Sequence, residues 1–244
     1  MKTAIIITGA MRTFDRCLPA LHWHVFRHYL EADFFVSTVK DEDAGKAELL
    51  RAKYPKAKVE IEAVPAQPDC VAELMAKGVP FPAKWTPGQT YTHEPYAISV
   101  EPQAVVRQLW QLERGYKLLA ASGGAHQCVI RCRPDLWFHS FTPPPVGAME
   151  SHVPWWGRFG GVNDRFAVMG HAAAAQYFTA YSAIPELVAA GCPIHPESLV
   201  KAAASRAGCY TRPTLKAEFS TLRKNGETRP PEISTIDLAH VALS

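Results

Sequence analysis

Short β-branched runs alternate with helix-like segments through the first 64 residues, and this order constrains the fold more than any other feature. Strands are predicted at Ala4–Thr8, at Asp33–Val39 and over the alternating run 58–64. Helices are predicted between them, one capped by Asp15 and a charged one over 43–54. Strand–helix–strand repeats of this kind build a parallel sheet with crossover helices. The chain is therefore predicted to be an α/β protein.

The composition of the chain changes over residues 65–100, where prolines and aromatic residues are interspersed. This stretch is too aromatic to remain solvated, so it is predicted to be an insertion or lid within a single domain that spans 1–244. An amphipathic helix then starts near Pro102 and leads into a predicted strand over 129–138. The second half is predicted to hold two helices and a last strand, over residues 171–181, 196–208 and 216–226.

Composition and motifs exclude several classes of protein. The net charge of +3 comes from charges of mixed sign, so a nucleic-acid partner is not expected. No apolar run approaches the roughly 18 residues of a membrane span, and the N-terminus lacks a full signal peptide. The cysteines are scattered, as reduced thiols would be, and a cytoplasmic protein is expected. The turn "ITGAMRT" has one glycine where a dinucleotide fingerprint needs three, and no phosphate loop, HExxH or GxSxG motif occurs.

Ligands of open α/β sheets bind beyond the carboxyl ends of the strands. The first predicted strand ends at Thr8, Gly9 and Arg12. The second predicted strand ends at Ser37, Thr38 and Asp41. The predicted strand over 129–138 has Arg133 and Asp135 near its end. These three strand ends form the predicted binding pocket.

The predicted strand over 129–138 carries three ionisable side chains in an otherwise apolar run. Alternation along a strand would place Arg131, Arg133 and Asp135 on one face. Buried charges are costly unless they are paired or bind a ligand. One interpretation is an internal ion pair between an arginine and Asp135. The other is an anion and metal site, since guanidinium groups bind phosphate oxygens and a carboxylate suits a divalent cation.

Four stretches, in this order, resemble a known family: "TGAMRTF" (8–14), "VIRCRPDLWF" (129–138), "GGVNDRFAVMG" (160–170) and "HPESLV" (195–200). The chain is similar to bacterial nucleotide-sugar-dependent glycosyltransferases of the GT-A fold, which build surface polysaccharide or lipopolysaccharide. The resemblance implies a Rossmann-like, GT-A-like domain. It also implies a nucleotide-sugar donor and a glycan or glycolipid acceptor, with association at a membrane surface left open.

The resemblance also implies roles for individual residues. The D-x-D motif of the family, which holds a divalent metal (Mn or Mg) on the donor diphosphate, corresponds to Arg133, Pro134 and Asp135. Asp135 is the implied metal ligand, but the first acid is replaced by Arg133, which could itself neutralise the diphosphate. Donor binding is implied for the following residues: Thr8, Gly9, Arg12, Thr13, Arg131, Arg133 and Asp135.

Two carboxylates are candidates for the catalytic base that deprotonates the acceptor. Asp164 lies in a glycine-flanked loop, where a turn or cap role is the alternative. Glu197 lies in the first turn of a predicted helix, beside His195, where it could simply complement the helix dipole. Trp155 and Trp156 could stack on sugars, but neighbours on a strand face opposite ways, so at least one is expected in the core.

Two other functions remain open from the sequence. The missing first acid would also suit a non-catalytic relative that binds glycans or nucleotides. A sugar-phosphate nucleotidyltransferase would need a glycine-rich basic loop after the first strand, and "TGAMRT" is a poor version of it.

Overall fold

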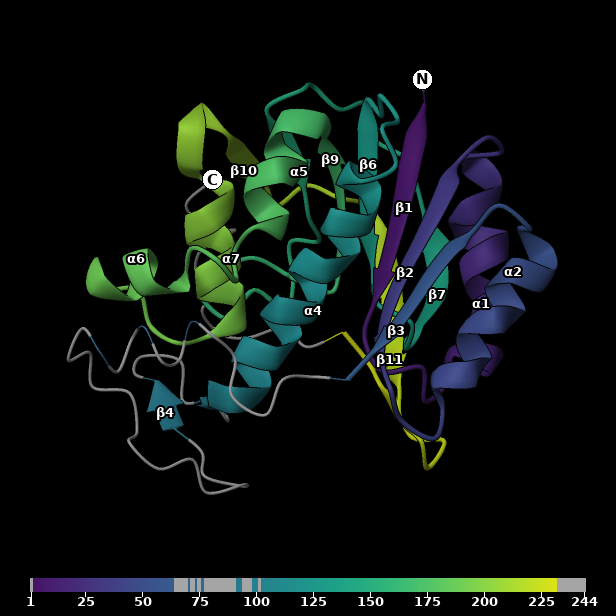
Figure 1. Cartoon of the computed structure of the whole chain (residues 1–244), viewed down its shortest axis with the longest axis horizontal. Coiled ribbons are helices and arrows are strands. Elements are labelled where there is room, and N and C mark those ends of the chain that lie inside the picture. The colour runs from purple at the N-terminus through teal and green to yellow at the C-terminus, as the bar shows by residue number, and fades with distance from the viewer. Residues whose placement is uncertain are drawn as a thin grey trace.

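The computed structural model describes residues 2–63, 70, 73, 76, 91–93, 98–100 and 102–231 (Figure 1). Most of the predicted insertion at 65–100 lies outside the described residues. The part that is described includes a two-stranded antiparallel hairpin of β4 (Tyr91–His93) and β5 (Ile98–Val100). The division of the chain into one domain with an insertion stays a prediction.

A seven-stranded sheet forms the centre of the described chain, in the order β10-β8-β9-β6-β1-β2-β3. Its strands are β1 (Thr3–Thr8), β2 (Asp33–Val39), β3 (Lys58–Glu62), β6 (Cys128–Cys132), β8 (Glu150–His152), β9 (Phe166–Gly170) and β10 (Tyr210–Arg212). Only β9 among them runs antiparallel to its neighbours. The mostly parallel α/β sheet is thus confirmed, and it is consistent with the GT-A-like domain that the resemblance implied.

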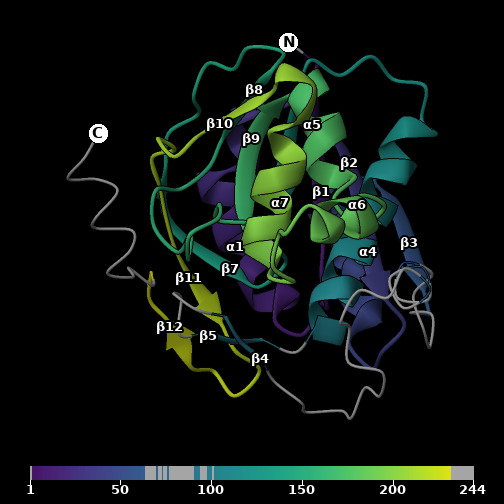
Figure 2. The same ribbon diagram turned by 90° about the vertical axis from the view of Figure 1, so that its left-hand side faces the viewer.

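Helices cover both faces of this sheet (Figures 1 and 2). The α-helices are α1 (Phe14–His24), α2 (Glu48–Lys53), α4 (Pro102–Ala120), α5 (His171–Phe178), α6 (Ile184–Ala189) and α7 (Pro196–Ala204). Within the described residues there are also 3₁₀ turns: η1 (Phe26–His28), η2 (Ala44–Ala47) and η3 (Arg206–Gly208). The side chains of β1 alternate between two core clusters, one on each face of the sheet. Ala4 and Ile6 pack with α4, α5 and α7, whereas Ile5 and Ile7 pack with α1. Thr13, not Asp15, is the N-cap residue of α1, and Asp15 lies in its first turn.

The predicted strand over 129–138 is wrong as a single strand. It is two strands in two sheets, because β6 ends at Cys132 and the chain turns through Arg133–Asp135 before β7. Pro134 in that turn has no N–H to donate to a ladder, which favours a break at this point. Arg133 and Asp135 therefore do not share a strand face with Arg131; they lie in the turn that follows it.

The second sheet is antiparallel and consists of β7 (Leu136–Phe141), β11 (Ala217–Leu222) and β12 (Thr228–Arg229). It packs on the α1 side of the central sheet, where α1 also contacts β7. The backbone N–H of Leu222 donates to the carbonyl of Asp135 at 2.9 Å. The end of β11 is thereby fixed beside the turn that follows β6, although the two are some 90 residues apart in the sequence.

A close approach sets the position of α4 over the sheet. A Cβ atom on Gly115 would lie 2.5 Å from Cγ2 of Thr8 and 2.7 Å from Cγ2 of Ile6. Glycine therefore lets α4 lie directly against β1. The first half of α4 lies beside the carboxyl ends of the parallel strands (Figure 1), where Gln111 Nε2 donates to the carbonyl of Ser37 at 3.2 Å.

Within the described ranges, none of the helices combines the length and the apolar composition that crossing a bilayer requires.

Candidate functional site

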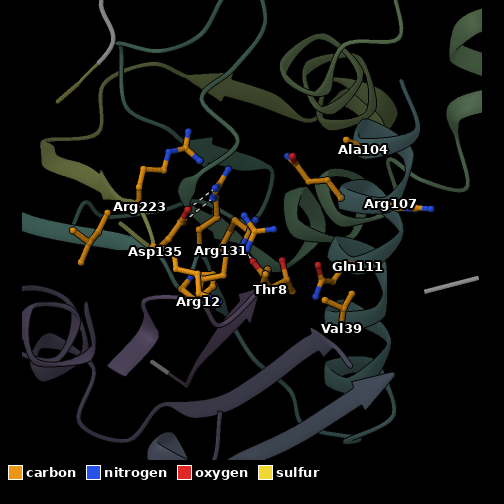
Figure 3. Close-up of a pocket in the computed structure, with 16 residues that line it drawn as sticks. Thr8, Arg12, Val39, Ala104, Arg107, Gln111, Arg131, Asp135 and Arg223 are labelled. Carbon is orange, nitrogen blue, oxygen red and sulfur yellow. Dashed lines mark hydrogen bonds and ion pairs between the residues drawn. The ribbon is translucent and has the colours of Figure 1, made fainter. Parts of the chain in front are cut away.

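A cavity of about 400 Å³ lies at the carboxyl ends of β1, β2 and β6 (Figure 3). Its walls come from these strand ends, from the first half of α4 and from the end of β11. The lining residues are Thr8, Gly9, Ala10, Arg12, Val39, Ala104, Arg107, Gln108, Gln111, Arg131, Arg133, Pro134, Asp135, Leu222, Arg223 and Lys224. The position agrees with the rule that ligands bind beyond the carboxyl ends of an open α/β sheet.

Most of the predicted donor-binding residues meet in this cavity. Six line it: Thr8, Gly9, Arg12, Arg131, Arg133 and Asp135. Thr13 does not, because it is buried and its Oγ1 donates to the carbonyl of Leu222 at 3.1 Å. Ser37 and Thr38 are also buried outside the lining, and Val39 represents β2 there. Asp41 is exposed and accepts a hydrogen bond from the Asp43 N–H within its own turn.

Two groups of lining residues were not predicted. The first lies on α4 and comprises Arg107, Gln108 and Gln111; Gln111 is only 7% exposed, and a buried glutamine in an amphipathic helix is the signal that could have revealed it. The second is the end of β11, with Arg223 and Lys224. No local pattern marks these two as site residues, because only the packing of the second sheet brings them there.

The charge of the lining is strongly unbalanced. Among the described residues of the lining there is one carboxylate, Asp135, and there are the following cationic side chains: Arg12, Arg107, Arg131, Arg133, Arg223 and Lys224. Lys224 is partly neutralised by Glu42 and by Asp43, whose Oδ2 is 3.3 Å from Nζ. Arg107 extends outward from α4 at the rim (Figure 3). The remaining cations surround a space that suits an anion with several charges.

Arg131 is the most deeply buried of these cations, at 2% exposure. Its Nη1 donates to the carbonyls of Thr8 at 3.1 Å and of Cys132 at 2.6 Å. Its Nε is buried without a hydrogen-bond partner. Burial lowers the pKa of Arg131, an effect opposed by the nearby Tyr177 and Asp164. Burying a guanidinium is costly, and the charge of an anionic ligand in the adjoining cavity would offset part of that cost.

Arg133 and Asp135 form a bidentate ion pair at the cavity wall. Nε of Arg133 donates to Oδ1 of Asp135 at 2.9 Å and Nη2 donates to Oδ2 at 2.6 Å. Burial alone would raise the pKa of Asp135, but the charge and hydrogen bonds of Arg133, with help from Arg223, hold this pKa below its ordinary value. The ion-pair interpretation is therefore correct for Arg133. The pair is not sealed inside the protein, however, because the side chains remain 26% and 15% exposed and line the cavity.

The lining does not fit the divalent metal that the resemblance implied. Asp135 is the one carboxylate among the lining residues that the structure describes, and both of its oxygens already accept hydrogen bonds from Arg133. Hard divalent cations need several oxygen ligands, and the remaining charged groups of the lining are cations. Nowhere in the described ranges do three or more His, Cys, Asp or Glu side chains gather as a metal-ligand group. The described side chains around Asp135 therefore do not suit a divalent cation.

The two predicted catalytic carboxylates lie behind the cavity, not in its wall. Asp164 and Glu197 are 4% and 7% exposed. The Nε2 atom of Gln108 donates to Oδ2 of Asp164, so this glutamine, which does line the cavity, separates Asp164 from it. Burial, and then the negative charge of Asp164, raises the pKa of Glu197 well above its ordinary value, while Arg165 and Arg133 act weakly in the other direction. The two carboxyl groups thus interact, as acids that share a site do.

Local structure holds this carboxylate pair in place. Asn163 Oδ1 accepts the Arg165 N–H at 3.0 Å, and its Nδ2 donates to the Trp156 carbonyl at 2.9 Å, which fixes the loop around Asp164. The loop meets the start of α7 where the Val162 N–H donates to the Glu197 carbonyl at 3.1 Å. His195 is the N-cap residue of α7, and its Nε2 lies 3.2 Å from Oε2 of Glu197.

The tryptophan expectation is confirmed for Trp156. It is buried, packs on Phe219 and donates from Nε1 to the Ala217 carbonyl at 3.3 Å, so it is a core residue. Trp155 is partly buried against the same core cluster and does not line the cavity.

The raised pKa of Glu197 predicts a pH dependence of stability that Glu197→Gln removes. A carboxyl group whose folded-state pKa is raised stabilises the fold fully below its unfolded pKa, and this contribution is lost as pH rises through the folded pKa. Glutamine mimics the protonated acid and does not titrate. We expect the melting temperature of Glu197→Gln, minus that of the original chain, to increase as pH rises from about 5 to about 8. Melting curves at constant ionic strength measure this difference, and parallel curves would contradict it.

Comparison with known proteins assigns no family. The sequence matches no protein-family model, and no curated protein matches it. A solved structure with a similar backbone is the crystal structure of mouse xyloside xylosyltransferase 1 in its apo form. The two chains are 12% identical, with a TM-score of 0.39, and the match covers 86% of this chain and 83% of the other. At this level the likeness carries no conclusion about activity.

Proposed function

We propose that the chain is a glycosyltransferase that transfers a sugar from a nucleoside diphosphate-sugar donor to a hydroxyl group of a glycan or glycolipid acceptor. The observation that carries the proposal is the cationic cavity at the carboxyl ends of the parallel strands, with Arg131 buried beside it and one Nε donor unused. A diphosphate is the anion that such a set of guanidinium groups suits, because each fork can bind two phosphate oxygens.

In this proposal the donor lies across the ends of β1 and β6. Arg131 and Arg133 bind the diphosphate, and the turn after β1, with Thr8, Gly9 and Arg12, borders the nucleotide. A Cβ at Gly9 would lie 2.9 Å from Cδ of Pro134, so glycine keeps the two turns in contact and the cavity wall continuous. The cations would also stabilise the charge that develops on the leaving diphosphate.

Asp164 is the proposed base for the acceptor. The acceptor hydroxyl oxygen forms a bond to the anomeric carbon of the donor sugar, and its proton passes to Asp164. The bond from the anomeric carbon to the β-phosphate oxygen breaks, and its electron pair leaves with the nucleoside diphosphate. For this step the Gln108 side chain must turn away from Asp164, since it separates the carboxylate from the cavity in the structure. Glu197 is the proposed partner of Asp164, whose charge, after burial, raises the pKa of Glu197.

The finer assignment, to bacterial surface polysaccharide or lipopolysaccharide synthesis in the cytoplasm, rests on the four sequence stretches alone. The aromatic insertion at 65–100 is the proposed region for acceptor choice, and most of it lies outside the described residues.

Nucleoside diphosphates should stabilise the chain against heat. At a ligand concentration of about 100 times Kd the gain is about 2.7 kcal/mol, which corresponds to a shift of roughly 5–10 °C for a chain of this size. UDP, GDP, CDP and their sugars, each with manganese and with a chelator, form the panel for differential scanning fluorimetry. Arg12→Ala removes an exposed cation from the cavity and should reduce the shift, whereas Arg206→Ala removes an exposed cation paired with Glu186 elsewhere and should not.

The outcomes separate the alternatives. No shift with any nucleotide would contradict the proposal. A shift without transfer or donor hydrolysis would favour a non-catalytic nucleotide-binding protein. Release of pyrophosphate from a nucleoside triphosphate and a sugar phosphate would instead identify a nucleotidyltransferase.

A further inference from the structure

The position that holds a metal-binding acid in the resembling family holds an ion pair in this chain. The turn after β6 presents Arg133 where the first acid would stand, and its guanidinium occupies both oxygens of Asp135. Each carboxylate oxygen of Asp135 thus accepts a hydrogen bond from Arg133. Burial would lower the pKa of Arg133, but the charge of Asp135 more than offsets this and raises it, so the guanidinium remains charged.

Three further cations lie near this pair. Arg131 is buried beside the cavity, with one donor unused. Arg223 lowers the pKa of Asp135, so its charge acts at the pair. Arg12 lines the cavity from the turn after β1, and its side chain has no ion-pair partner among the residues that the structure describes. A divalent cation would enter this positive field at a cost, whereas a diphosphate would relieve it.

We infer that this cavity binds the diphosphate of its substrate through guanidinium groups and without a divalent cation, with Asp135 acting as a positioning residue for Arg133. The inference rests on the proposed function and specifies how its leaving group is stabilised. Arginine suits this role because its planar fork binds two phosphate oxygens at once and keeps its charge at any working pH. Asp135 fixes the guanidinium of Arg133 through two hydrogen bonds. The orientation of the remaining N–H donors of Arg133 is thereby set by Asp135.

Inorganic pyrophosphate is the probe that tests this inference, because it carries the diphosphate without base or sugar. Isothermal titration of the full chain with pyrophosphate in EDTA should show saturable binding. Adding manganese in place of EDTA, after correction for the metal–pyrophosphate complex, should change Kd by less than about threefold, well under the factor of ten that 1.4 kcal/mol represents. Binding that occurs only with manganese, or is at least about tenfold tighter with it, would overturn the inference.

The variants separate a positioning role for Asp135 from metal ligation. Arg133→Met should weaken pyrophosphate binding in EDTA by roughly 10–100-fold, the loss expected for charge-assisted hydrogen bonds. Asp135→Asn should weaken it by a smaller factor, also in EDTA. In the double variant the second change should add little, because Asp135 acts through Arg133. Additive losses, or an Asp135→Asn effect confined to the manganese arm, would contradict the positioning role.

Two further variants serve as controls for Arg133→Met. Arg206→Ala makes the same change in net charge at a distant surface and should leave Kd unchanged. Arg133→Lys keeps the charge but not the fork, so it should still lose affinity, and it replaces Arg133→Met if that variant melts early. If nucleoside diphosphates bind and turn over only with manganese, this inference fails while the proposed function stands. If neither pyrophosphate nor any nucleotide binds under either condition, the proposed function fails as well.

Discussion

Replacing Asp164 by asparagine should lower the rate of sugar transfer by roughly 10²–10⁴-fold, the usual contribution of a general base. Asparagine keeps the size of the side chain and can still accept the hydrogen bond from Gln108, but it cannot take the acceptor proton. The loss should therefore appear in kcat, with donor affinity little changed, because Asp164 does not line the cavity that would bind the diphosphate.

Glu197→Gln is the matched control for this variant. Burial and the charge of Asp164 raise the pKa of Glu197, which shifts this residue toward its protonated form, and glutamine imitates that form. We expect Glu197→Gln to retain transfer activity within about tenfold of the original chain. If Glu197→Gln were the inactive variant and Asp164→Asn the active one, the two roles would be reversed.

Steady-state kinetics on whichever nucleotide-sugar the binding panel identifies measure both effects. Both variants must melt cooperatively, since Asp164 and Glu197 are buried among several charges. Gln108→Ala adds a second readout: it exposes Asp164 to the cavity, so its activity should not fall to the level of Asp164→Asn. An equal loss in Gln108→Ala would point to a role for the glutamine itself.

Phe219→Ala should destabilise the chain by roughly 3–5 kcal/mol, as large-to-small changes of buried aromatics do. Phe219 is 1% exposed and joins the second sheet to the central one. Its ring centroid lies 4.6 Å from that of Trp156, 5.0 Å from that of Phe138 and 6.2 Å from that of Phe166. Alanine would remove these ring contacts and leave a cavity between the two sheets.

Trp137→Ala is the control in the same sheet. Trp137 lies on β7, opposite Ser220 of β11, and is 39% exposed, so its loss should cost about 1 kcal/mol or less. Urea unfolding of both variants measures the two free energies of unfolding. A loss in Phe219→Ala no larger than that in Trp137→Ala would show that the second sheet does not depend on this contact.

The function of the cavity should depend on the same contact. The strand that carries Phe219 ends at Leu222, and the chain then supplies Arg223 and Lys224 to the cavity wall. Phe219→Ala should therefore weaken pyrophosphate binding even at temperatures where the variant remains folded, whereas Trp137→Ala should not.

Much of the fold could be predicted from local pattern. The β-branched run that became β1 is buried on both faces, and the helix, strand and crossover order of the first 62 residues follows as expected. These features are predictable because backbone propensity and side-chain periodicity act within a few residues. The grouping of Thr8, Gly9 and Arg12 with Arg131, Arg133 and Asp135 was also predictable, since carboxyl ends of neighbouring parallel strands must meet at one edge.

The break after Cys132 and the partners of the charged residues could not be predicted in this way. The alternation continues through Arg133 and Asp135 and Pro134 is the one local sign of a break, but only the pairing of β7 with β11 shows that the chain changes sheets there. Likewise, the contact of Gln108 with Asp164 joins residues 56 positions apart. Such contacts depend on how closely whole layers pack against one another, and side-chain periodicity within one segment carries no information about that distance.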